Sequence, residues 1–400
     1  MHILVVSQFF YPESFRYNDI AVEFAKRGYK VTVLTGIPNY PMGKFFPGYS
    51  WTKKRREKWN GIDIIRIPII PRGKNYFGMI LNLYSFVVSG WLWNQANDIH
   101  ADIVFSFESS PFHQLKVGCW YAKKHKVPHY AYVQDLWPEN FETVTGIHNR
   151  LIVGPIDTMV DKIYSQLDKI FVTSPAFVEA VVNRKKTVDR NKVIYWPQYA
   201  EEFYRPIPKQ NIESIPDDNC FKIAFTGNIG YAQGLDILPR TAMLLKGEDI
   251  RFIIVGDGRY LTEFIKLINN YNVNDMFILI PRVESKRIPE ILSVCDAGFV
   301  SFSNNALWEK TIPAKMQSYM ACGKAIVASA AGETKRIIEE SGCGICCELG
   351  SAESLAQGIR ELSKDDIIIR GAKARAYFEK HFQKTMLIDK MVEYLSEVNI

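Results

Sequence analysis

One glycine-containing turn in the second half of the chain has the composition of an anion-binding loop. Gly227-Asn-Ile-Gly230 follows an apolar stretch and precedes a segment of helical character that starts near Gly234. Glycine lets backbone N–H groups approach a bound anion, and the start of a helix adds a favourable dipole. The turn therefore predicts a phosphate-binding loop, although the Gly-x-x-Gly spacing alone is not specific.

A single lysine gives a second indication of phosphate binding. Pro313 suits the first turn of a helix, and Lys315 then lies in the same turn. A lysine at this place is unfavourable for the helix dipole, and a bound anion would relieve the repulsion. We expect Lys315 to contact phosphate; the alternative is a lysine that points into solvent.

Glycines also follow another apolar stretch, in Val255-Gly-Asp-Gly258. The spacing departs from the dinucleotide fingerprint G-x-G-x-x-G, because Leu261 stands where the third glycine should be. A nicotinamide cofactor is therefore disfavoured.

Two loops of the first half carry charged groups after predicted strands. Arg16 ends the loop that follows the first strand, and its guanidinium can pair with phosphate. Asp135 and Glu139 lie in Gln134-Asp-Leu-Trp-Pro-Glu139, directly after an expected strand. The alternative for both loops is a purely structural role in packing or capping.

These residues need strands whose ends lie together. His2–Ser7 is a continuous apolar run, typical of a strand buried on both faces, and a helix over Ala21–Arg27 leads to a strand over Lys30–Thr35. Further strands are expected at 62–70, 102–107, 129–133 and 169–173, with helices at 114–124 and 153–166. The first half is thus a doubly wound α/β domain.

The same pattern restarts after a linker that is rich in proline and polar residues, 203–219. Strands are expected at 221–226, 251–255, 276–280, 297–302, 325–328 and 344–348, and a single long helix at 373–398. We predict a first domain over residues 1–203, a second over 204–372 and a terminal helix over 373–400. Ligands of such sheets bind at the carboxyl ends of the strands, facing a cleft between the domains.

The segment Asn75–Asn97 contains no charged residue. Its length permits a membrane span, but Gly78, Asn82, Ser85 and Ser89 form a small and polar stripe on one face. A basic segment that includes Lys53, Arg55, Arg72 and Lys74 precedes it, and Phe77 and Trp91 lie within it. The sequence favours a helix in the interface of an anionic bilayer, leaving an ordinary core helix or a span as alternatives.

Composition sets the outer bounds. With 400 residues and 47% hydrophobic residues, the chain is large enough for two cores, and a net charge of +6 is too mild to indicate a nucleic-acid binder. Seven scattered cysteines, and a Met1 that leads directly into a strand, predict a cytoplasmic chain with free thiols. Cys343, Cys346 and Cys347 have no second Cys/His cluster near them, so zinc is disfavoured.

The ordered set of motifs resembles family 4 glycosyltransferases. In the second half the resemblance rests on Gly-Asn-Ile-Gly-x-x-Gln-Gly, Val-Gly-Asp-Gly and Ile-Pro-Ala-Lys-x-x-x-Tyr-Met-Ala-x-Gly-Lys; in the first half it rests on Tyr11-Pro-Glu13, Pro38-Asn-Tyr-Pro41 and Gln134–Glu139. The last string resembles the branch that builds bacterial capsule and O-antigen repeats, including N-acetyl-L-fucosamine transferases. The resemblance covers nearly the whole chain.

This resemblance implies a GT-B fold of two Rossmann-like domains, with the terminal helix crossing back onto the first. It implies retaining transfer without a metal or other cofactor from a nucleoside-diphosphate sugar, which we expect to be UDP-linked. The uncharged helix and the basic segment fit a polyprenyl-diphosphate-linked saccharide as the acceptor, at the inner face of the cell membrane. Asp135, Glu139 and Lys315 are the expected catalytic residues. The expected donor-binding residues are Arg16, Gly227, Asn228, Gly230, Gln233, Gly256, Arg282, Glu309, Lys315, Ser318 and Glu333.

The chain departs from the family pattern in places. Many members carry two glutamates eight residues apart, whereas this chain has Lys310, beside Glu309, and Ser318. Asn228 and Gln233 occupy the region where many members have an arginine and a lysine. A nucleotide-sugar 2-epimerase, for which His113 is the nearby histidine, and a non-catalytic nucleotide-sugar-binding subunit therefore remain alternatives.

Overall fold

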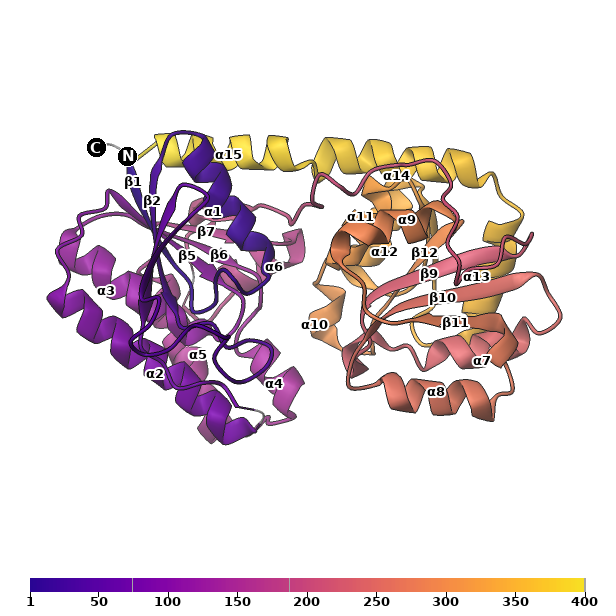
Figure 1. The fold of residues 1–400 in the computed structure, drawn as a ribbon, viewed down its shortest axis with the longest axis horizontal. Helices are drawn as coiled ribbons and strands as arrows, with labels where there is room; N and C mark the ends of the chain where they lie inside the picture. The colour runs from indigo at the N-terminus through magenta and orange to yellow at the C-terminus, as the bar shows by residue number, and fades with distance from the viewer. Residues whose placement is uncertain (74, 187, 399–400) are drawn as a thin grey trace. The chain divides into compact units, whose positions relative to one another are not determined.

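The computed structural model describes residues 1–73, 75–186 and 188–398, and these form two compact units (Figure 1). Unit 1 contains Met1–Thr173, Phe177–Trp196 and the chain from Ile388 onward, and unit 2 contains Ser174–Ala176 and Pro197–Leu387. The main division thus falls after Trp196, a few residues before the predicted boundary at residue 203. Each unit is built around its own sheet.

The sheet of unit 1 has the strand order β3-β4-β2-β1-β5-β6-β7-β8. Its neighbouring strands are parallel except β3 and β4, which pair antiparallel. The strands are β1 His2–Val6, β2 Lys30–Gly36, β3 Arg56–Trp59, β4 Ile62–Ile67, β5 Ile103–Glu108, β6 His129–Val133, β7 Lys169–Val172 and β8 Val193–Tyr195. Two of them were not predicted: β3, which lies in the basic segment, and the short β8.

Helices cover both faces of this sheet. They are α1 Arg16–Lys26, α2 Tyr76–Ala96, α3 Leu115–His125, α4 Glu139–Thr145, α5 Arg150–Tyr164 and α6 Pro175–Val182, with a short 3-10 turn at Phe112–Gln114. On one face, Phe86 of α2 and Val117 of α3 pack with Leu4 and Val6. On the other face, Phe24 of α1 contacts Phe105, with the ring centres 5.5 Å apart.

Unit 2 has an all-parallel sheet with the order β11-β10-β9-β12-β13-β14. Its strands are β9 Phe221–Asn228, β10 Ile250–Asp257, β11 Phe277–Ile280, β12 Ala297–Ser301, β13 Ala325–Ser329 and β14 Gly344–Cys347. The strand order reverses between β9 and β12. Loops at the carboxyl ends of such a pair form the usual ligand site of doubly wound sheets.

Two hydrophobic clusters flank this second sheet. One holds residues of α7 Ile237–Leu244, α8 Leu261–Asn270 and α13 Ala352–Ser363; the other holds residues of α9 Ile288–Ser293, α11 Ala314–Ala321, α12 Gly332–Ser341 and α14 Ile367–His381. A short α10, Ala306–Glu309, precedes α11. Both domains are therefore α/β layers with helices on each face, as predicted.

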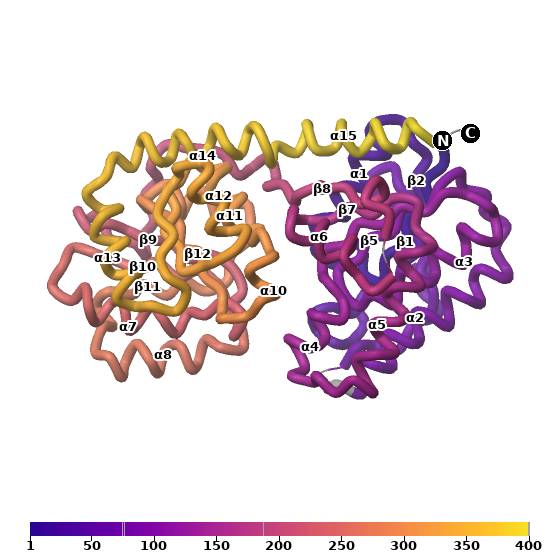
Figure 2. Tube along the Cα trace, turned by 180° about the vertical axis from the view of Figure 1, so that it is seen from behind, coloured from indigo at the N-terminus to yellow at the C-terminus, as the bar shows by residue number. Residues whose placement is uncertain are grey.

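The single long helix predicted at 373–398 is wrong. The structure has two helices there, α14 and α15 Lys384–Ser396, with a break at Phe382. Arg375 of α14 donates a hydrogen bond to the carbonyl of Ala321 in unit 2. From Ile388 onward α15 belongs to unit 1, where Asp389 pairs with Arg27 at 2.8 Å and Glu397 with Lys169 at 2.9 Å. Figure 2 shows α15 in yellow beside α1.

Candidate active site

The glycine turns of unit 2 lie against each other at the carboxyl ends of β9 and β10. Gly227 and Gly256 are paired across these strands. Their backbone φ values are 137° and 149°, which residues other than glycine rarely adopt. A Cβ on Gly256 would stand 1.9 Å from the carbonyl oxygen of Gly227, and one on Gly258 would stand 2.2 Å from that of Ile229. The turn predicted to bind phosphate therefore packs directly against the second glycine turn, and neither Gly256 nor Gly258 has room for a side chain.

Lys315 lies beside this turn. It is the second residue of α11, whose N-cap is Pro313, and its Nζ donates a hydrogen bond to Oε1 of Gln233. The Nζ also lies 3.7 Å from the centre of the Phe225 ring, and its Cε is 3.9 Å from the Cβ position of Gly227. The structure thus brings together three of the predicted donor-binding residues: Gly227, Gln233 and Lys315.

The buried environment of Lys315 disfavours its protonated, charged form. Burial of the ammonium group lowers the pKa of Lys315 to about 7. Across the described part of the chain, no carboxylate forms an ion pair with it, and the contacts are an amide oxygen and an aromatic face. A nearby anion would favour the charged lysine, so this position is suited to a phosphate.

Tyr319, which the sequence analysis did not select, fixes α11 in place. Its hydroxyl accepts a hydrogen bond from the backbone N–H of Thr226 at 2.8 Å, and the hydroxyl of Thr226 lies 3.2 Å away. A Cβ on Gly298 would stand 2.3 Å from the Tyr319 ring, so β12 and α11 touch directly. Since Tyr319 follows Lys315 by one helical turn, it positions the lysine against β9. Its place in the Ile-Pro-Ala-Lys-x-x-x-Tyr motif, four residues after Lys315, could have identified Tyr319 from the sequence.

Ser318 and Glu333 are both engaged by protein groups. Ser318 is buried, and its hydroxyl donates to the carbonyl of Ala314 at 3.2 Å, one turn earlier in α11. The carboxylate of Glu333 pairs with Arg336 at 2.8 Å and accepts the N–H of Ala176 at 2.8 Å. The geometry therefore gives both residues a structural function, whatever contact they make with a donor.

A pocket lies next to the glycine turns, at the carboxyl ends of β10 and β11. Its volume is about 310 Å³, and apolar side chains from Ile229, Leu261 and Leu279 line it together with Gly256 and Arg282. Asp257 also lines it. Such a pocket, largely apolar with one cation and one carboxylate, suits a flat heterocycle. Two further predicted residues, Asn228 and Gly230, belong to the same turn: Asn228 Nδ2 lies 2.7 Å from the Cβ position of Gly230. Glu309, another predicted residue, is the last residue of α10. Its backbone packs closely against Gly332, where a Cβ would stand 1.9 Å from the carbonyl oxygen of Glu309.

In unit 1, Asp135 follows β6 and lies near a buried carboxyl group that the sequence analysis missed, Glu108. The carboxyl of Glu108 accepts backbone N–H groups from Ser110 at 2.8 Å, Asp135 at 3.2 Å and Gln134 at 3.3 Å. Burial raises the pKa of both Glu108 and Asp135, and the charge of Asp135 raises that of Glu108 further. Glu108 therefore fixes the loop that carries Asp135.

The remaining predicted groups of unit 1 lie in the neighbouring loops. Glu139 is the first residue of α4, where its charge is favourable, and its Oε2 is buried without a hydrogen-bond partner among the described residues. Arg16 is the first residue of α1. Burial raises the pKa of Tyr132 in β6, and the positive charge of Arg16 partly offsets that rise. Before Arg16, Glu13 accepts the N–H groups of Asn39 at 2.7 Å and Tyr40 at 2.6 Å, which ties together the loops after β1 and β2.

His113 is enclosed by aromatic rings. Tyr84 lies 5.8 Å and Trp137 6.1 Å from it, measured between ring centres. Burial, followed by the charge of Lys116, lowers the pKa of His113 to about 4, so the imidazole stays neutral at physiological pH. This environment gives no support to a histidine that exchanges protons in an epimerase.

Helix α2 turns its polar stripe towards the protein. Asn82 is buried and donates to the carbonyl of Ile70 at 2.6 Å, while Ser89 donates to that of Pro68 at 2.5 Å. The large hydrophobic side chains that the helix exposes are Phe77, which is 69% exposed, and Ile80, Tyr84, Val88, Trp91 and Leu92. Gln95, near the end of the helix, is also exposed. In the described part of the chain, no helix combines the length and hydropathy needed to cross a bilayer.

The basic residues before α2 are only partly free. Arg55 uses its guanidinium to bind the carbonyls of Arg66 and Trp51. Arg72 lies over the Tyr40 ring at 5.2 Å, and Lys53 is exposed. Lys74, which was also predicted to contact the membrane, lies outside the described residues.

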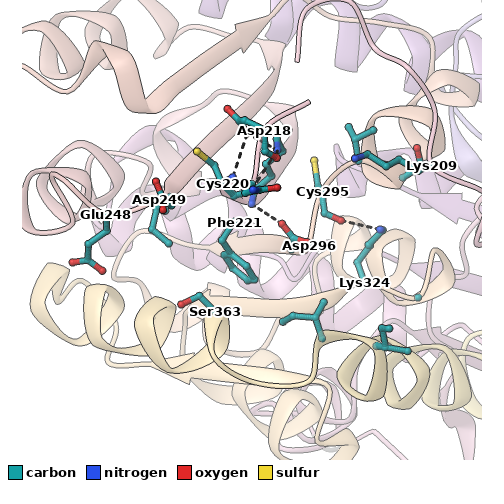
Figure 3. Close-up of a pocket in the computed structure, with 18 residues that line it drawn as sticks. Lys209, Asp218, Cys220, Phe221, Glu248, Asp249, Cys295, Asp296, Lys324 and Ser363 are labelled. Atoms are coloured by element: carbon teal, nitrogen blue, oxygen red, sulfur yellow. Dashed lines mark hydrogen bonds and ion pairs between the residues drawn. The ribbon is translucent and has the colours of Figure 1, made fainter. Parts of the chain in front are cut away.

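A larger pocket, of about 730 Å³, lies at the opposite, amino-terminal edge of the unit 2 sheet (Figure 3). Two of its lysines are bound by protein groups: Lys222 pairs with Asp218 at 2.7 Å, and Lys324 donates to the carbonyl of Cys295 at 2.8 Å. The pocket lies at the other end of the strands from the glycine turns, so it is separate from the candidate donor site.

Comparison with known proteins agrees with the geometry. The description "Glycosyl transferase 4-like domain" matches residues 15–197, and "Glycosyl transferases group 1" matches residues 208–385. The chain is a glycosyltransferase with the GT-B fold. WcaI of Escherichia coli K12, a glycosyl transferase assigned to colanic acid biosynthesis, is 24% identical over 401 residues, which cover 94% of each chain.

Several solved structures share the fold of this glycosyltransferase. Sucrose-phosphate synthase from Thermosynechococcus elongatus superposes with a TM-score of 0.76 at 14% identity, covering 99% of this chain and 98% of the other. Anabaena HepE in complex with UDP and glucose gives a TM-score of 0.72 at 16% identity, covering 99% and 100%. At these identities the likeness concerns the fold alone.

Proposed function

We propose that this glycosyltransferase transfers a sugar from a UDP-linked donor to a lipid-linked saccharide in bacterial surface polysaccharide synthesis, with retention of configuration and without a metal. The observation that carries the proposal is the position of Lys315 beside the glycine turn of Gly227. A fixed cation and backbone N–H groups at this place act where the diphosphate gains charge during transfer.

The reaction proceeds by attack from the face of the sugar that the diphosphate leaves. The bond between the anomeric carbon and the β-phosphate oxygen breaks, and the acceptor hydroxyl oxygen forms the new bond to that carbon. The proton of this hydroxyl passes to the departing phosphate. Lys315 and the Gly227–Gly230 turn stabilise the leaving group, whereas Asp135 and Glu139 orient sugar hydroxyls and form no covalent bond.

The apolar pocket beside the turns is the proposed place of the nucleobase. Ile229, Leu261 and Leu279 offer apolar surface, and Arg282 lies at the edge. The complex of HepE with UDP and glucose makes UDP the first nucleotide to test. The name of WcaI supports a surface polysaccharide as the product, and the branch that includes N-acetyl-L-fucosamine transferases makes UDP-N-acetyl-L-fucosamine a donor of interest.

The outer surface of α2 supports work at a membrane. Its polar stripe is used inside the protein, so the apolar side chains of Phe77, Val88 and Trp91 are left outside. Together with Lys53 and Arg72, this surface suits the interface of an anionic bilayer. We propose that the enzyme is peripheral on the inner face of the cell membrane and takes a polyprenyl-diphosphate-linked saccharide there.

A thermal-shift panel of nucleotide sugars, followed by a transfer assay, tests this function. We expect UDP-sugars to raise the unfolding temperature more than GDP- or ADP-sugars, and one of them to support transfer to a lipid-linked acceptor. NMR of the product distinguishes retention from inversion. Binding without transfer to any acceptor would instead support a nucleotide-sugar-binding subunit, and release of free epimerised sugar would support an epimerase.

A further inference from the structure

A small pocket between α3 and α5 of unit 1 combines an apolar floor with two lysines. Its volume is about 360 Å³, and none of its lining residues belongs to the loop that carries Asp135. Trp120, Met159 and Ile163 supply apolar surface, and Lys116 and Lys162 supply the charge. Its other lining residues are Cys119, Pro155, Thr158 and Gln166, so no carboxylate lines it.

The two lysines repel each other. Burial, followed by the charge of Lys162, lowers the pKa of Lys116. Among the described residues, neither ammonium group has a carboxylate within ion-pair distance, whereas the half-buried Arg27 and Arg184 of the same unit each have one. Lys116 is half-buried and Lys162 is exposed, and an anion between them would relieve the repulsion of the two like charges.

The apolar lining of the pocket continues along α5 to the protein surface. Leu151, Pro155 and Met159 follow one another at four-residue spacing and share a face of the helix, and Lys162 comes less than one turn later. Leu151 is 85% exposed, and the adjacent Ile152 is 46% exposed. An apolar strip thus leads from solvent to the lysine pair, which suits a ligand with an apolar tail and an anionic head.

Helix α3, which supplies one wall of the pocket, also packs against α2. His113 lies one turn before Lys116 and contacts the exposed Tyr84 of α2. Figures 1 and 2 both show α2, α3 and α5 as neighbours at one side of unit 1. A lipid bound between α3 and α5 would therefore lie beside the surface proposed to face the bilayer.

We propose that this pocket binds the phosphate group of an anionic lipid between Lys116 and Lys162, with the apolar chain along Trp120, Met159 and Leu151. The inference deepens the proposed function, because it rests on the enzyme working at a membrane, but it is independent of the sugar donor. The pocket gives the enzyme a specific contact with a lipid phosphate, beyond the general attraction of basic residues to an anionic surface.

Calorimetry with soluble short-chain lipids tests the site directly. The full chain is titrated with dihexanoyl phosphatidic acid below its micelle-forming concentration, with dihexanoyl phosphatidylcholine and with inorganic phosphate. We expect saturable binding of phosphatidic acid, and binding of the other two that is weaker by about tenfold or more, because each lacks either the exposed phosphate or the apolar chain. Equal binding of inorganic phosphate would overturn the lipid as ligand, and no saturable binding of phosphatidic acid would overturn the site.

Variants then locate the binding. Lys116→Gln combined with Lys162→Gln should weaken phosphatidic acid binding by about tenfold or more. The matched control, Lys123→Gln with Lys186→Gln, removes two exposed lysines that do not line the pocket and should leave the affinity unchanged. Lys162→Glu alone, at an exposed position, provides a second test that does not disturb the buried end of the pocket. Equal losses in the pocket and control variants would overturn the assignment.

A further readout separates this inference from the proposed function. Donor affinity, measured with the best UDP-sugar of the thermal-shift panel, should be the same in the pocket variant and the unmodified enzyme. If lipid binding depends on the two lysines but no sugar transfer is found, the transfer proposal fails and the lipid site stands. If transfer is found and phosphatidic acid does not bind, the lipid site fails alone.

Discussion

The ammonium group of Lys315 lies 3.7 Å from the centre of the Phe225 ring. This contact joins the start of α11 to the end of β9, because Phe225 belongs to the strand that leads into the Gly227 turn. An aromatic face attracts a cation but cannot neutralise it, so the lysine keeps its capacity to bind a phosphate. The arrangement explains a lysine in the first turn of a helix, where the dipole alone disfavours it.

Replacing Lys315 should impair sugar transfer more than it impairs folding. We expect Lys315→Ala to reduce kcat/KM by about tenfold or more, equivalent to about 1.4 kcal/mol of transition-state stabilisation. Lys315→Arg keeps the charge and should retain more activity. Kinetics with the best donor measure the effect, thermal unfolding verifies the fold, and unchanged transfer in Lys315→Ala would remove the lysine from the mechanism.

Donor affinity should fall as the pH rises above neutrality. Burial holds the pKa of Lys315 at about 7, and a bound diphosphate raises it, so binding favours the protonated lysine. The contribution of the charged lysine is complete below the pKa of the free enzyme and declines as pH rises through that value. Calorimetry with UDP-glucose, whose diphosphate does not titrate in this range, measures the dependence from about pH 6 to about pH 9. Lys315→Arg should give a flatter profile, and an equally flat profile in the unmodified enzyme would count against the role of the lysine.

Gly256→Ala should abolish donor binding, because a Cβ there would stand 1.9 Å from the carbonyl oxygen of Gly227 and displace the phosphate turn. Gly247→Ala is the matched control: Gly247 also has positive φ, at 89°, but no atom lies within 4 Å of its Cβ position. The control should lose about 1–2 kcal/mol of stability through backbone strain and still bind the donor. Similar donor affinities of the two variants would show that the close approach of the turns is not required.

Tyr319→Phe should destabilise unit 2 by about 1–3 kcal/mol, because the buried N–H of Thr226 loses its acceptor. The same change should weaken donor binding, since α11 carries Lys315. Tyr231→Phe, at a tyrosine that is 63% exposed, is the control and should change little. Denaturant unfolding gives the first quantity and calorimetry the second; a stable Tyr319→Phe variant with normal affinity would contradict the positioning role.

The outer surface of α2 should govern binding to vesicles. Phe77→Gln combined with Trp91→Gln should reduce sedimentation with anionic vesicles, because it removes apolar area from the proposed interface. Ile368→Gln with Ile369→Gln makes an equivalent change on exposed apolar residues of α14 in unit 2 and should have no effect. If the unmodified protein sediments with neither neutral nor anionic vesicles, the membrane location is wrong.

The sequence by itself determined both α/β domains, most of their strands and the position of the glycine turn that we propose binds phosphate. Apolar runs such as Leu4–Val6 and Phe252–Val255 are unambiguous because strands buried on both faces need continuous hydrophobicity. Local sequence was enough to select Gly227, Gly256 and Lys315 as candidate site residues. Glycines directly after strands, and a lysine in the first turn of a helix, are features of a few neighbouring residues. The single terminal helix was predicted wrongly, because residues 382 and 383 carry no strong breaking signal and the division follows from packing on two units.

Tertiary structure alone decided which groups meet. Glu108 lies in a strand and looks like any buried-strand residue, yet the fold aims three backbone N–H groups at its carboxyl. The polar stripe of α2 could have faced water; the carbonyls of Pro68 and Ile70 hold it inside, and the apolar side chains are exposed instead. Lys116 and Lys162 line one pocket only because α3 and α5 pack together, since residues so far apart in the chain are brought together by the fold.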